Sequence, residues 1–575
     1  MNSGGAMISK VLLENRVPCI FTLCGGHISP ILTESEKAGI RIIDTRHEAT
    51  AVFAADCVGR LTGKPGIAAV TAGPGLTNTI TAIKNAQMAQ SPLILFGGAA
   101  ATLLKGKGSL QDIDQMALIK PHVKWAVSIR RVAQIVPVIR KAFRVAASGV
   151  PGPVFIECPV DVLYPPEIVK EWYFTKSGSG KTSFTDRLQQ WYVKRHVHRL
   201  FNQKTSTTLS EEDAQVTFPV HSFQHKKAAE RLLAQSSRPL MIIGSGAMMN
   251  PTEIDSLVNA VETLGIPVYL SGMARGLMGK SHPLHMRHKR REAIKEADLI
   301  ILAGLPNDFR LNYGYHIGHR PFISINRSRK DLYLNKKPTL AIHGDPAYFL
   351  QQTLKVKSGK FSSWIQHLKN RDHERDIEIK KQSSVEGRYI NPLQLLNQFN
   401  EFKPENSVII ADGGDFVATA SYMLDLYEPL SWLDPGAFGT LGVGAGFALG
   451  AKVIYPDKQV WIIYGDGSSG YGLMEYDTFV RHQLPIISII GNDACWAQIA
   501  RDQVELLHSD CAVMLQPSHY EKVGHAFDAD GVMVKSIAEF QESMMNALLA
   551  ANHGKPYIIN ARIDRSEFRK GSLSM

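Results

Sequence analysis

The sequence predicts an α/β protein made of three consecutive domains, each built on a parallel sheet, and three observations support this. First, 575 residues are more than one hydrophobic core usually organises. Second, short apolar runs of strand length alternate with longer helix-like segments, which is typical of strand–helix–strand units. Third, the alternation is interrupted twice, so that the chain divides into three blocks.

The expected domain boundaries follow these two interruptions. The first block covers residues 1–165, the second 223–354 and the third 389–575. Residues 166–222 are polar and show no clear periodicity, so we interpret them as an insertion or linker. Residues 355–388 are highly charged and are expected to form a helical linker.

Each block contains several expected strands. In the first block they are residues 19–23, 41–44, 67–71, 93–97 and 154–157. In the second they are residues 239–243, 268–270, 299–303 and 322–326, and in the third 408–411, 460–464, 486–491 and 557–561. Gly244 and Gly246 follow a strand, but Met249 occupies the third glycine position of a dinucleotide-binding loop, so they indicate a tight turn in a nucleotide-free, Rossmann-like domain.

The chain is basic, with a formal net charge of +11 and a local run of cations at residues 287–291. Nucleic-acid binding is not expected, because aromatic side chains do not alternate with these cations as a base-stacking surface requires. We interpret the run as a solvated helix face. The alternative is a patch for an anionic substrate such as an acyl-CoA.

The cysteines and the apolar runs of the sequence bear on where in the cell the protein is expected to lie. The six cysteines have no zinc-ligand or CxxC spacing and are expected to be reduced thiols. The longest apolar run, residues 92–104, is too short to span a bilayer. The sequence begins almost directly on a helical pattern, so membrane association is expected only if an N-terminal anchor is missing from it.

The strongest motif lies in the third block. Gly465, Asp466 and Gly467 end one expected strand, and Asn492 and Asp493 end the next. A crossover connection would place these strands side by side, so that both ends offer oxygen ligands to one hard cation. Alone, Gly-Asp-Gly is a common turn. With the Asn-Asp pair, the pattern favours Mg²⁺ held together with a diphosphate.

Three loops of the first block complete the pattern. Gly26 and His27 follow the first expected strand, Glu48 follows the second, and a glycine-rich turn at residues 71–78 follows the third. Glu48 at a helix start could merely complement the helix dipole. Taken together, the loops lie where parallel sheets bind ligands, at the carboxyl ends of strands.

The sequence resembles the thiamine diphosphate-dependent superfamily of acetohydroxyacid synthases, benzaldehyde lyases and 2-hydroxyacyl-CoA lyases. Residues 45–55, 432–443 and 491–493 carry the resemblance, which covers nearly the whole chain except 166–222. It implies a pyrimidine-binding domain, a central Rossmann-like domain and a diphosphate-binding domain, in that order.

The resemblance implies roles for individual residues. Glu48 would hydrogen-bond the aminopyrimidine ring and so activate the thiazolium carbon. Leu441 would wedge between the two rings of the cofactor, although an ordinary core leucine would look the same. His27 and Gln111 would lie on the substrate side, and Trp496 would shape the pocket. Without the resemblance, a buried structural histidine is the better interpretation of His27.

Asp466 and Asp493 match the metal-binding side chains, and Cys495 matches a position that binds metal through its backbone carbonyl. Many relatives have Asn-Asn where this chain has Asn492 and Asp493, so either residue of the pair remains a candidate. The further cofactor-binding positions implied are Gly26, Asn78, Gly413, Gly414, Asp415, Gly465, Gly467 and Ser468.

The resemblance also implies a reaction and an assembly. The expected reaction is cleavage of a 2-hydroxyacyl-CoA to formyl-CoA and an aldehyde one carbon shorter. Carboligation to acetolactate or another hydroxyketone is the alternative, and a cofactor-binding scaffold without turnover is a further one. The active site is expected between the subunits of a homodimer, or of a homotetramer, and the compartment is the endoplasmic reticulum or the cytoplasm.

Overall fold

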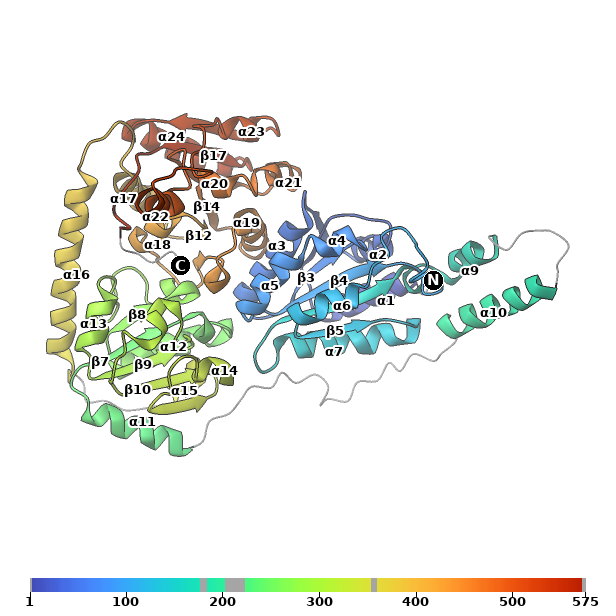
Figure 1. Cartoon of the computed structure of the whole chain (residues 1–575), viewed down its shortest axis with the longest axis horizontal. Coiled ribbons are helices and arrows are strands. Elements are labelled where there is room, and N and C mark those ends of the chain that lie inside the picture. Colours follow the sequence, from blue (N-terminus) through green and yellow to red (C-terminus); the bar gives the residue numbers. More distant parts are fainter. Residues whose placement is uncertain (1–2, 176–183, 202–222, 353–358, 571–575) are drawn as a thin grey trace. The chain divides into compact units, whose positions relative to one another are not determined.

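The computed structural model describes residues 3–175, 184–201, 223–352 and 359–570 (Figure 1). The chain forms two compact units, residues 1–216 and 217–575. The first unit contains one parallel sheet, and the second contains two. Three parallel sheets covered by helices confirm the predicted fold class.

The sheet of the first unit has the strand order β2-β1-β3-β4-β6-β5. Its strands are β1 (Cys19–Thr22), β2 (Arg41–Asp44), β3 (Gly66–Val70), β4 (Leu93–Ala99), β5 (Trp125–Ser128) and β6 (Pro153–Pro159). The helices are α1 (Gly4–Glu14), α2 (Ser29–Lys37), α3 (Glu48–Thr62), α4 (Pro74–Thr77), α5 (Ile80–Met88), α6 (Gln115–Ile119), α7 (Ile135–Ala147) and α8 (Val160–Leu163).

Two further helices lie in the segment that we interpreted as an aperiodic insertion. They are α9 (Pro166–Thr175) and α10 (Phe184–Phe201). The apolar residues of α10 are spread around the helix, so the sequence shows no single apolar stripe from which the helix could be predicted. The remainder of the insertion, residues 176–183 and 202–222, lies outside the described residues.

The central sheet has the order β11-β10-β9-β7-β8 and lies in the second unit. Its strands are β7 (Pro239–Ile243), β8 (Val268–Leu270), β9 (Leu299–Ala303), β10 (Phe322–Asn326) and β11 (Leu340–His343). The helices around it are α11 (Phe223–Gln235), α12 (Ile254–Leu264), α13 (Arg290–Glu296), α14 (Arg329–Leu332) and α15 (Pro346–Gln351).

Gly244 and Gly246 form the tight turn that the sequence predicts after β7. A Cβ on either residue would lie 2.7 Å from the carbonyl oxygen of Gly304, which follows β9. The glycines therefore allow two strand-end loops to touch, which explains them without a nucleotide.

The third sheet has the order β13-β12-β14-β15-β17-β16. Its strands are β12 (Ser407–Asp412), β13 (Trp432–Leu433), β14 (Gln459–Gly465), β15 (Ile486–Asn492), β16 (Asp530–Val534) and β17 (Tyr557–Arg562). The helices are α16 (Ser362–Ser383), α17 (Pro392–Phe402), α18 (Asp415–Met423), α19 (Val443–Ile454), α20 (Asp466–Ser469), α21 (Tyr476–Arg481), α22 (Ala497–Leu507), α23 (Glu521–His525) and α24 (Ile537–Asn552). The long helix α16 lies within residues 355–388, the segment that we expected to be a helical linker.

Strand position explains which strands the sequence reveals. Interior strands such as β4 and β7 are buried along their whole length, because helices cover both faces of a parallel sheet, and they appear as continuous apolar runs. All thirteen strands expected from the sequence are present, with ends shifted by at most two residues. The strands that were not predicted, β5, β11, β13 and β16, lie at sheet edges, and three of them are only partly buried.

Candidate active site

In the first unit, adjacent strands bring the predicted loops together. Strand β1 pairs with both β2 and β3, and β3 pairs with β4, all in parallel. The loop of Gly26 and His27, the start of α3 and the glycine-rich turn at residues 71–78 therefore lie at one edge of the sheet, as the sequence predicts.

Glu48 and Asn78 are in direct contact at this edge of the first unit's sheet. Glu48 is the first residue of α3 and is only 6% exposed. The Asn78 side-chain amide donates a hydrogen bond to Glu48 Oε2 at 3.0 Å. One carboxylate oxygen is thereby oriented by the protein, and Oε1 is not part of this bond.

His27 lies beside the same turn. Its Nδ1 is 3.2 Å from Thr71 Oγ1. Partial burial lowers the pKa of His27, so its imidazole is neutral near neutral pH and can take or give a proton. A Cβ on Gly98 would lie 2.5 Å from His27 Cβ, which shows how tightly the histidine packs against the end of β4.

The glycine-rich turn is held by Gln115, which was not among the residues predicted for the site. Gln115 is buried; its Oε1 accepts a hydrogen bond from Gly73 N at 3.2 Å, and its Nε2 donates to Glu157 Oε1 at 3.2 Å. Gln111, a predicted substrate-side residue, adopts a left-handed conformation with φ of 62°. Its carbonyl oxygen would be 2.8 Å from a Cβ on Gly73. No local sequence pattern predicts the role of Gln115 or Glu157, because their hydrogen-bond partners lie far away in the sequence.

In the third domain, the two halves of the Gly-Asp-Gly and Asn-Asp motif meet as predicted. Strands β14 and β15 are parallel neighbours, with Gly465 opposite Gly491. Asp466 is 3% exposed and accepts hydrogen bonds from Gly467 N at 2.8 Å and Cys495 N at 3.3 Å. The Asp466 carboxylate thus spans the ends of both strands.

The electrostatics of this strand edge favour a cation. Burial raises the pKa of Asp466 to about 6. Burial, together with the negative charge of Asp466, raises the pKa of Asp493 to about 7. A divalent cation would relieve both effects. Across the described residues, no three His, Cys, Asp or Glu side chains converge on a metal position.

Asn492 is engaged elsewhere. Its Nδ2 donates to Ser518 O at 3.1 Å and to Asn560 Oδ1 at 3.0 Å, and its Oδ1 accepts a bond from Arg562 Nη1 at 2.5 Å. These bonds use both ends of the amide, whereas Asp493 carries the charge that interacts with Asp466.

The turn after β12 requires glycine. Gly413 and Gly414 have φ values of 42° and 107°, and Gly414 precedes α18, whose first residue is Asp415. Leu441 packs against Gly413 so closely that a Cβ there would overlap its side chain. A Cβ on Gly414 would meet nothing within 4 Å, as is also true of Gly26 in the first unit, so both backbones leave room for a ligand.

Buried Asp412 holds the loop that carries Leu441. Its Oδ1 accepts a hydrogen bond from Gly442 N at 2.9 Å, and its Oδ2 accepts one from Gly444 N at 2.8 Å. Because these amides open α19, one carboxylate fixes both the helix start and the position of the adjacent leucine.

Trp496 and Ser468 shape the turn of Asp466. A Cβ on Gly467 would lie 2.5 Å from the Trp496 ring, so the indole lies directly on this turn. Ser468 Oγ accepts a hydrogen bond from Gly465 N at 3.1 Å and lies 3.2 Å from Gly465 O. The backbone amides of the turn are therefore preorganised.

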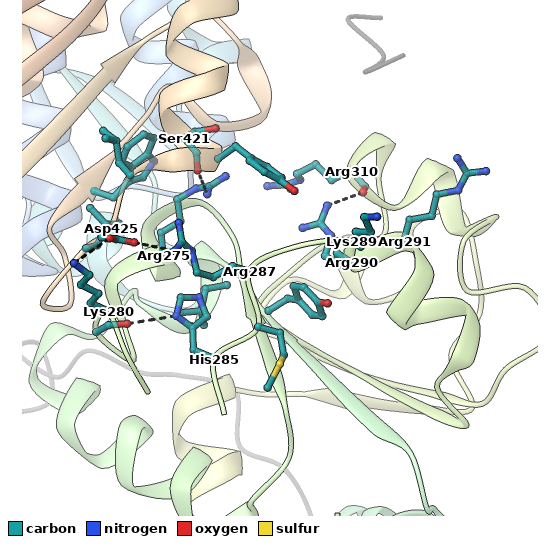
Figure 2. A pocket seen from close by; sticks show the side chains of 18 of the residues that line it. Arg275, Lys280, His285, Arg287, Lys289, Arg290, Arg291, Arg310, Ser421 and Asp425 are labelled. Carbon is teal, nitrogen blue, oxygen red and sulfur yellow. Dashed lines mark hydrogen bonds and ion pairs between the residues drawn. The ribbon is translucent and has the colours of Figure 1, made fainter. Parts of the chain in front are cut away.

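A basic pocket lies in the second unit, with a cavity of about 370 Å³ (Figure 2). Its cationic side chains are Arg275, Lys280, Arg287, Lys289, Arg290, Arg291, Arg310 and Arg569. Among the described residues that line it, Asp425 is the one acidic side chain, and it pairs with Lys280 at 3.2 Å and Arg287 at 3.0 Å.

Two of these arginines bind backbone carbonyls. Arg275 donates to Ser421 O at 2.5 Å and Arg290 to Arg310 O at 3.0 Å (Figure 2). In the described part of the chain, the buried Arg275 Nε has no hydrogen-bond partner. Burial, reinforced by the charges of Arg275 and Arg310, lowers the pKa of Arg290 to about 10. The pocket thus holds positive charge that an anion would stabilise.

The preferred interpretation of residues 287–291 as a solvated helix face is wrong. Helix α13 begins only at Arg290, and Arg287 and Lys289 precede it. The run instead lines the pocket, because the loop after β8 folds back toward the third sheet. Sequence periodicity cannot distinguish such a loop from the first turn of a helix.

Three family models match the chain in order. They are the thiamine pyrophosphate enzyme N-terminal TPP binding domain at residues 2–118, the central domain at 226–353 and the C-terminal TPP binding domain at 412–561. The chain belongs to the thiamine pyrophosphate enzyme family. It is therefore a thiamine diphosphate-dependent enzyme, and the whole segment 166–222 falls between the first two matches.

Individual family members are similar over their full length. The 2-hydroxyacyl-CoA lyase 2 of Danio rerio is 47% identical, with 100% of this chain and 93% of the relative covered. The 2-hydroxyacyl-CoA lyase 2 of Homo sapiens is 46% identical, with 100% and 92% covered. A probable acetolactate synthase of Mycobacterium bovis is 31% identical, with 98% and 96% covered.

The described residues fit the family's cofactor. A Cβ on Gly414 would meet nothing within 4 Å, so the backbone there has room for a diphosphate, and Asp466 and Asp493 provide two carboxylates in the same domain. The Glu48 carboxylate, held by Asn78, would be available to hydrogen-bond the pyrimidine ring. Among the described helices, none combines the length and apolar character needed to cross a membrane.

Proposed function

We propose that this enzyme cleaves a 2-hydroxyacyl-CoA to formyl-CoA and an aldehyde one carbon shorter. The observation that carries the proposal is full-length identity of 45–47% to proteins named 2-hydroxyacyl-CoA lyase 2, against 31% to acetolactate synthases. The lower value leaves carboligation as the alternative to be tested.

The reaction balances without water or an oxidant. The bond between the hydroxyl-bearing carbon and the thioester carbon breaks, and the hydroxyl proton is transferred, in net terms, to the carbon that becomes the formyl group. Thiamine diphosphate, when bound, supplies the nucleophilic carbon and the electron sink for this cleavage. The protein has to bind and orient both molecules, exclude water and move protons.

His27 and Glu48 are the residues proposed to act on protons. Glu48 would orient the pyrimidine ring through the oxygen that Asn78 leaves available. His27, neutral because burial lowers its pKa, would accept the substrate hydroxyl proton at Nε2 while Nδ1 stays near Thr71. Gln111 would help to position the substrate from the neighbouring loop.

We propose that Asp466 and Asp493 hold Mg²⁺, with the backbone carbonyl of Cys495 and the diphosphate as further ligands. We propose the carbonyl of Cys495 and not that of Ala494, because the Ala494 carbonyl already accepts a hydrogen bond from Leu515 N at 2.9 Å. Asn492 is assigned a structural role instead, since its amide is used within the sheet edge. Oxygen ligands of this kind suit Mg²⁺.

We further propose that the basic pocket binds the phosphates of coenzyme A. A cavity of about 370 Å³ with eight cations matches a phosphorylated nucleotide in charge. The two small keto acids joined by a carboligase carry no phosphate, so a phosphate-binding role for this pocket would favour the thioester substrate. The complete active site is proposed to form between two subunits of a homodimer or of a homotetramer.

Product analysis tests the function. Purified protein is incubated with Mg²⁺, thiamine diphosphate and a 2-hydroxyacyl-CoA, and aldehyde and formyl-CoA are measured by mass spectrometry. Cofactor-dependent formation of both in equal amounts supports the lyase. Acetolactate from pyruvate, without cleavage, would move the assignment to carboligation, and neither product would favour a scaffold.

A further inference from the structure

A second cavity lies wholly within the first unit and is walled by the helices of the insertion. Its volume is about 1220 Å³, and its lining is largely apolar, with His27 among the lining residues. We propose that it binds the hydrocarbon chain of the substrate and thereby selects long-chain 2-hydroxyacyl groups. This inference rests on the proposed function, because it assumes that His27 marks the reacting end of the substrate.

The wall contributed by α10 is unusually apolar for an exposed surface. Leu188, Trp191 and Tyr192 are 58%, 54% and 58% exposed, and Trp172 of α9 and Leu104 of the loop after β4 also line the cavity. Large apolar side chains that are exposed next to one another usually mark a binding site, because soluble proteins rarely leave such patches uncovered.

A buried polar network fixes the two helices in place. Asp161 of α8 is fully buried, and its Oδ2 accepts hydrogen bonds from Thr102 Oγ1 at 2.5 Å and Tyr173 OH at 2.7 Å. His196 Nε2 of α10 lies 2.8 Å from Thr102 Oγ1. These hydrogen bonds connect both α9 and α10 to the loop that follows β4. The two helices that wall the cavity are therefore held in place by buried polar contacts.

The cavity wall is continuous with the candidate catalytic loop. The rings of Tyr164 and Trp172 are 4.8 Å apart, and Tyr164 OH donates to Gly26 O at 3.3 Å. Gly26 precedes His27, whose side chain lines the cavity. A chain attached to the reacting carbon at His27 would therefore extend directly along Trp172 toward Trp191.

The size and chemistry of the cavity fit an alkyl chain. Small-molecule pockets usually enclose roughly 300–1,000 Å³, and this cavity is larger. Burial of each methylene strengthens binding by roughly fourfold, so an extended chain would gain affinity with its length. A short hydroxyacid would leave most of the cavity unfilled.

A membrane surface is the rival occupant, because α10 also carries basic residues. Helices that lie on membranes gather their apolar residues into one strongly amphipathic face. The apolar residues of α10 fall on more than one face: Val197 and Leu200 are buried, whereas Leu188, Trp191 and Tyr192 line a cavity whose lining includes His27. We therefore favour the substrate chain over a lipid bilayer.

The test compares 2-hydroxyacyl-CoAs of short and long chain in Trp191→Ala, Val193→Trp and a control, Tyr333→Ala. Val193 lines the cavity, so a tryptophan there fills it, whereas Tyr333 is an exposed aromatic residue of the central domain. We expect KM for the long-chain substrate to rise roughly tenfold in Trp191→Ala, with kcat and the short-chain KM unchanged. Val193→Trp is expected to shift the preference to shorter chains, and Tyr333→Ala to match the wild type.

Several outcomes would overturn the inference while leaving the lyase proposal intact. These are a wild-type enzyme without long-chain preference, or variants that affect all chain lengths equally. Trp191→Ala that loses binding to phospholipid vesicles but keeps its chain-length profile would assign α10 to a membrane. A changed oligomeric state with an unchanged profile would assign it to a contact between copies.

If no 2-hydroxyacyl-CoA is cleaved, the proposed function fails. Whether the cavity binds an alkyl chain is then tested separately, by measuring ligand binding. The affinity of the wild type and the same variants for a long-chain fatty aldehyde is then measured by isothermal titration calorimetry. Binding that weakens in Trp191→Ala and Val193→Trp supports the cavity as an alkyl-chain site. Equal binding, or none, overturns it.

Discussion

Asn78 donates its side-chain amide to the carboxylate of Glu48 at 3.0 Å, which joins the end of α4 to the first turn of α3. Glu48 is buried, so this bond fixes the carboxylate before any ligand arrives. In the proposed contact with the pyrimidine ring, the glutamate would therefore lose little conformational freedom on binding.

Glu48→Gln should remove activity while keeping the fold. The amide oxygen of glutamine can still accept the bond from Asn78, but the acidic group is lost. We expect kcat/KM to fall by roughly 10²–10⁴, with little change in Tm. Steady-state kinetics at saturating cofactor and thermal unfolding check this, and an unchanged rate would contradict the role of Glu48.

Asn78→Ala should act more mildly, through Glu48. Loss of one hydrogen bond to a carboxylate should lower kcat/KM by about tenfold. Thr77→Ala is the matched control, because Thr77 is exposed on the same turn. Cofactor affinity is measured alongside the rate; equal behaviour of the two variants would show that the bond has no positioning role.

Asp493→Asn and Asn492→Ala should separate metal binding from stability. The first variant should raise the Mg²⁺ concentration needed for half-maximal activity, by roughly 10-fold or more, with an unchanged Tm. The second leaves buried partners of the Asn492 amide unpaired and should lower the free energy of unfolding by about 3 kcal/mol. The reverse pattern, from Mg²⁺ titration and denaturant unfolding, would assign the metal to Asn492.

Asp412→Ala should destabilise the third domain and displace Leu441. It removes the acceptor of two backbone amides at the start of α19. The free energy of unfolding should fall by about 2–4 kcal/mol. Denaturant unfolding is the measurement. Glu401→Ala, on an exposed residue, is the control and should be neutral. A fully stable Asp412→Ala would contradict the capping role.

Arg290→Ala should weaken recognition of coenzyme A. We expect KM for the thioester to rise by roughly 10–100-fold, kcat to change little, and inhibition by free coenzyme A to be lost. Lys330→Ala, which removes an exposed cation of the same domain, should behave like the wild type. The wild-type KM should also rise with ionic strength. An unchanged KM in Arg290→Ala would exclude the pocket as the coenzyme A site.

The sequence by itself was enough to predict the interior strands, the order of the domains and the residues of the strand-end motifs. Interior strands of parallel sheets are buried on both faces, and the loops that follow them carry short motifs, so both leave local patterns. The pairing of β14 with β15, which brings together the two halves of the motif, followed from the crossover rule and was confirmed.

Tertiary structure alone decided the rest. Edge strands such as β5 are only partly buried and leave weak patterns. The support of Gly73 by Gln115, the engagement of Asn492 by Arg562 and the pocket around Arg290 each join segments far apart in the chain. A local pattern reports which face of an element is buried, whereas a hydrogen bond between distant residues exists only once the sheets bring them together.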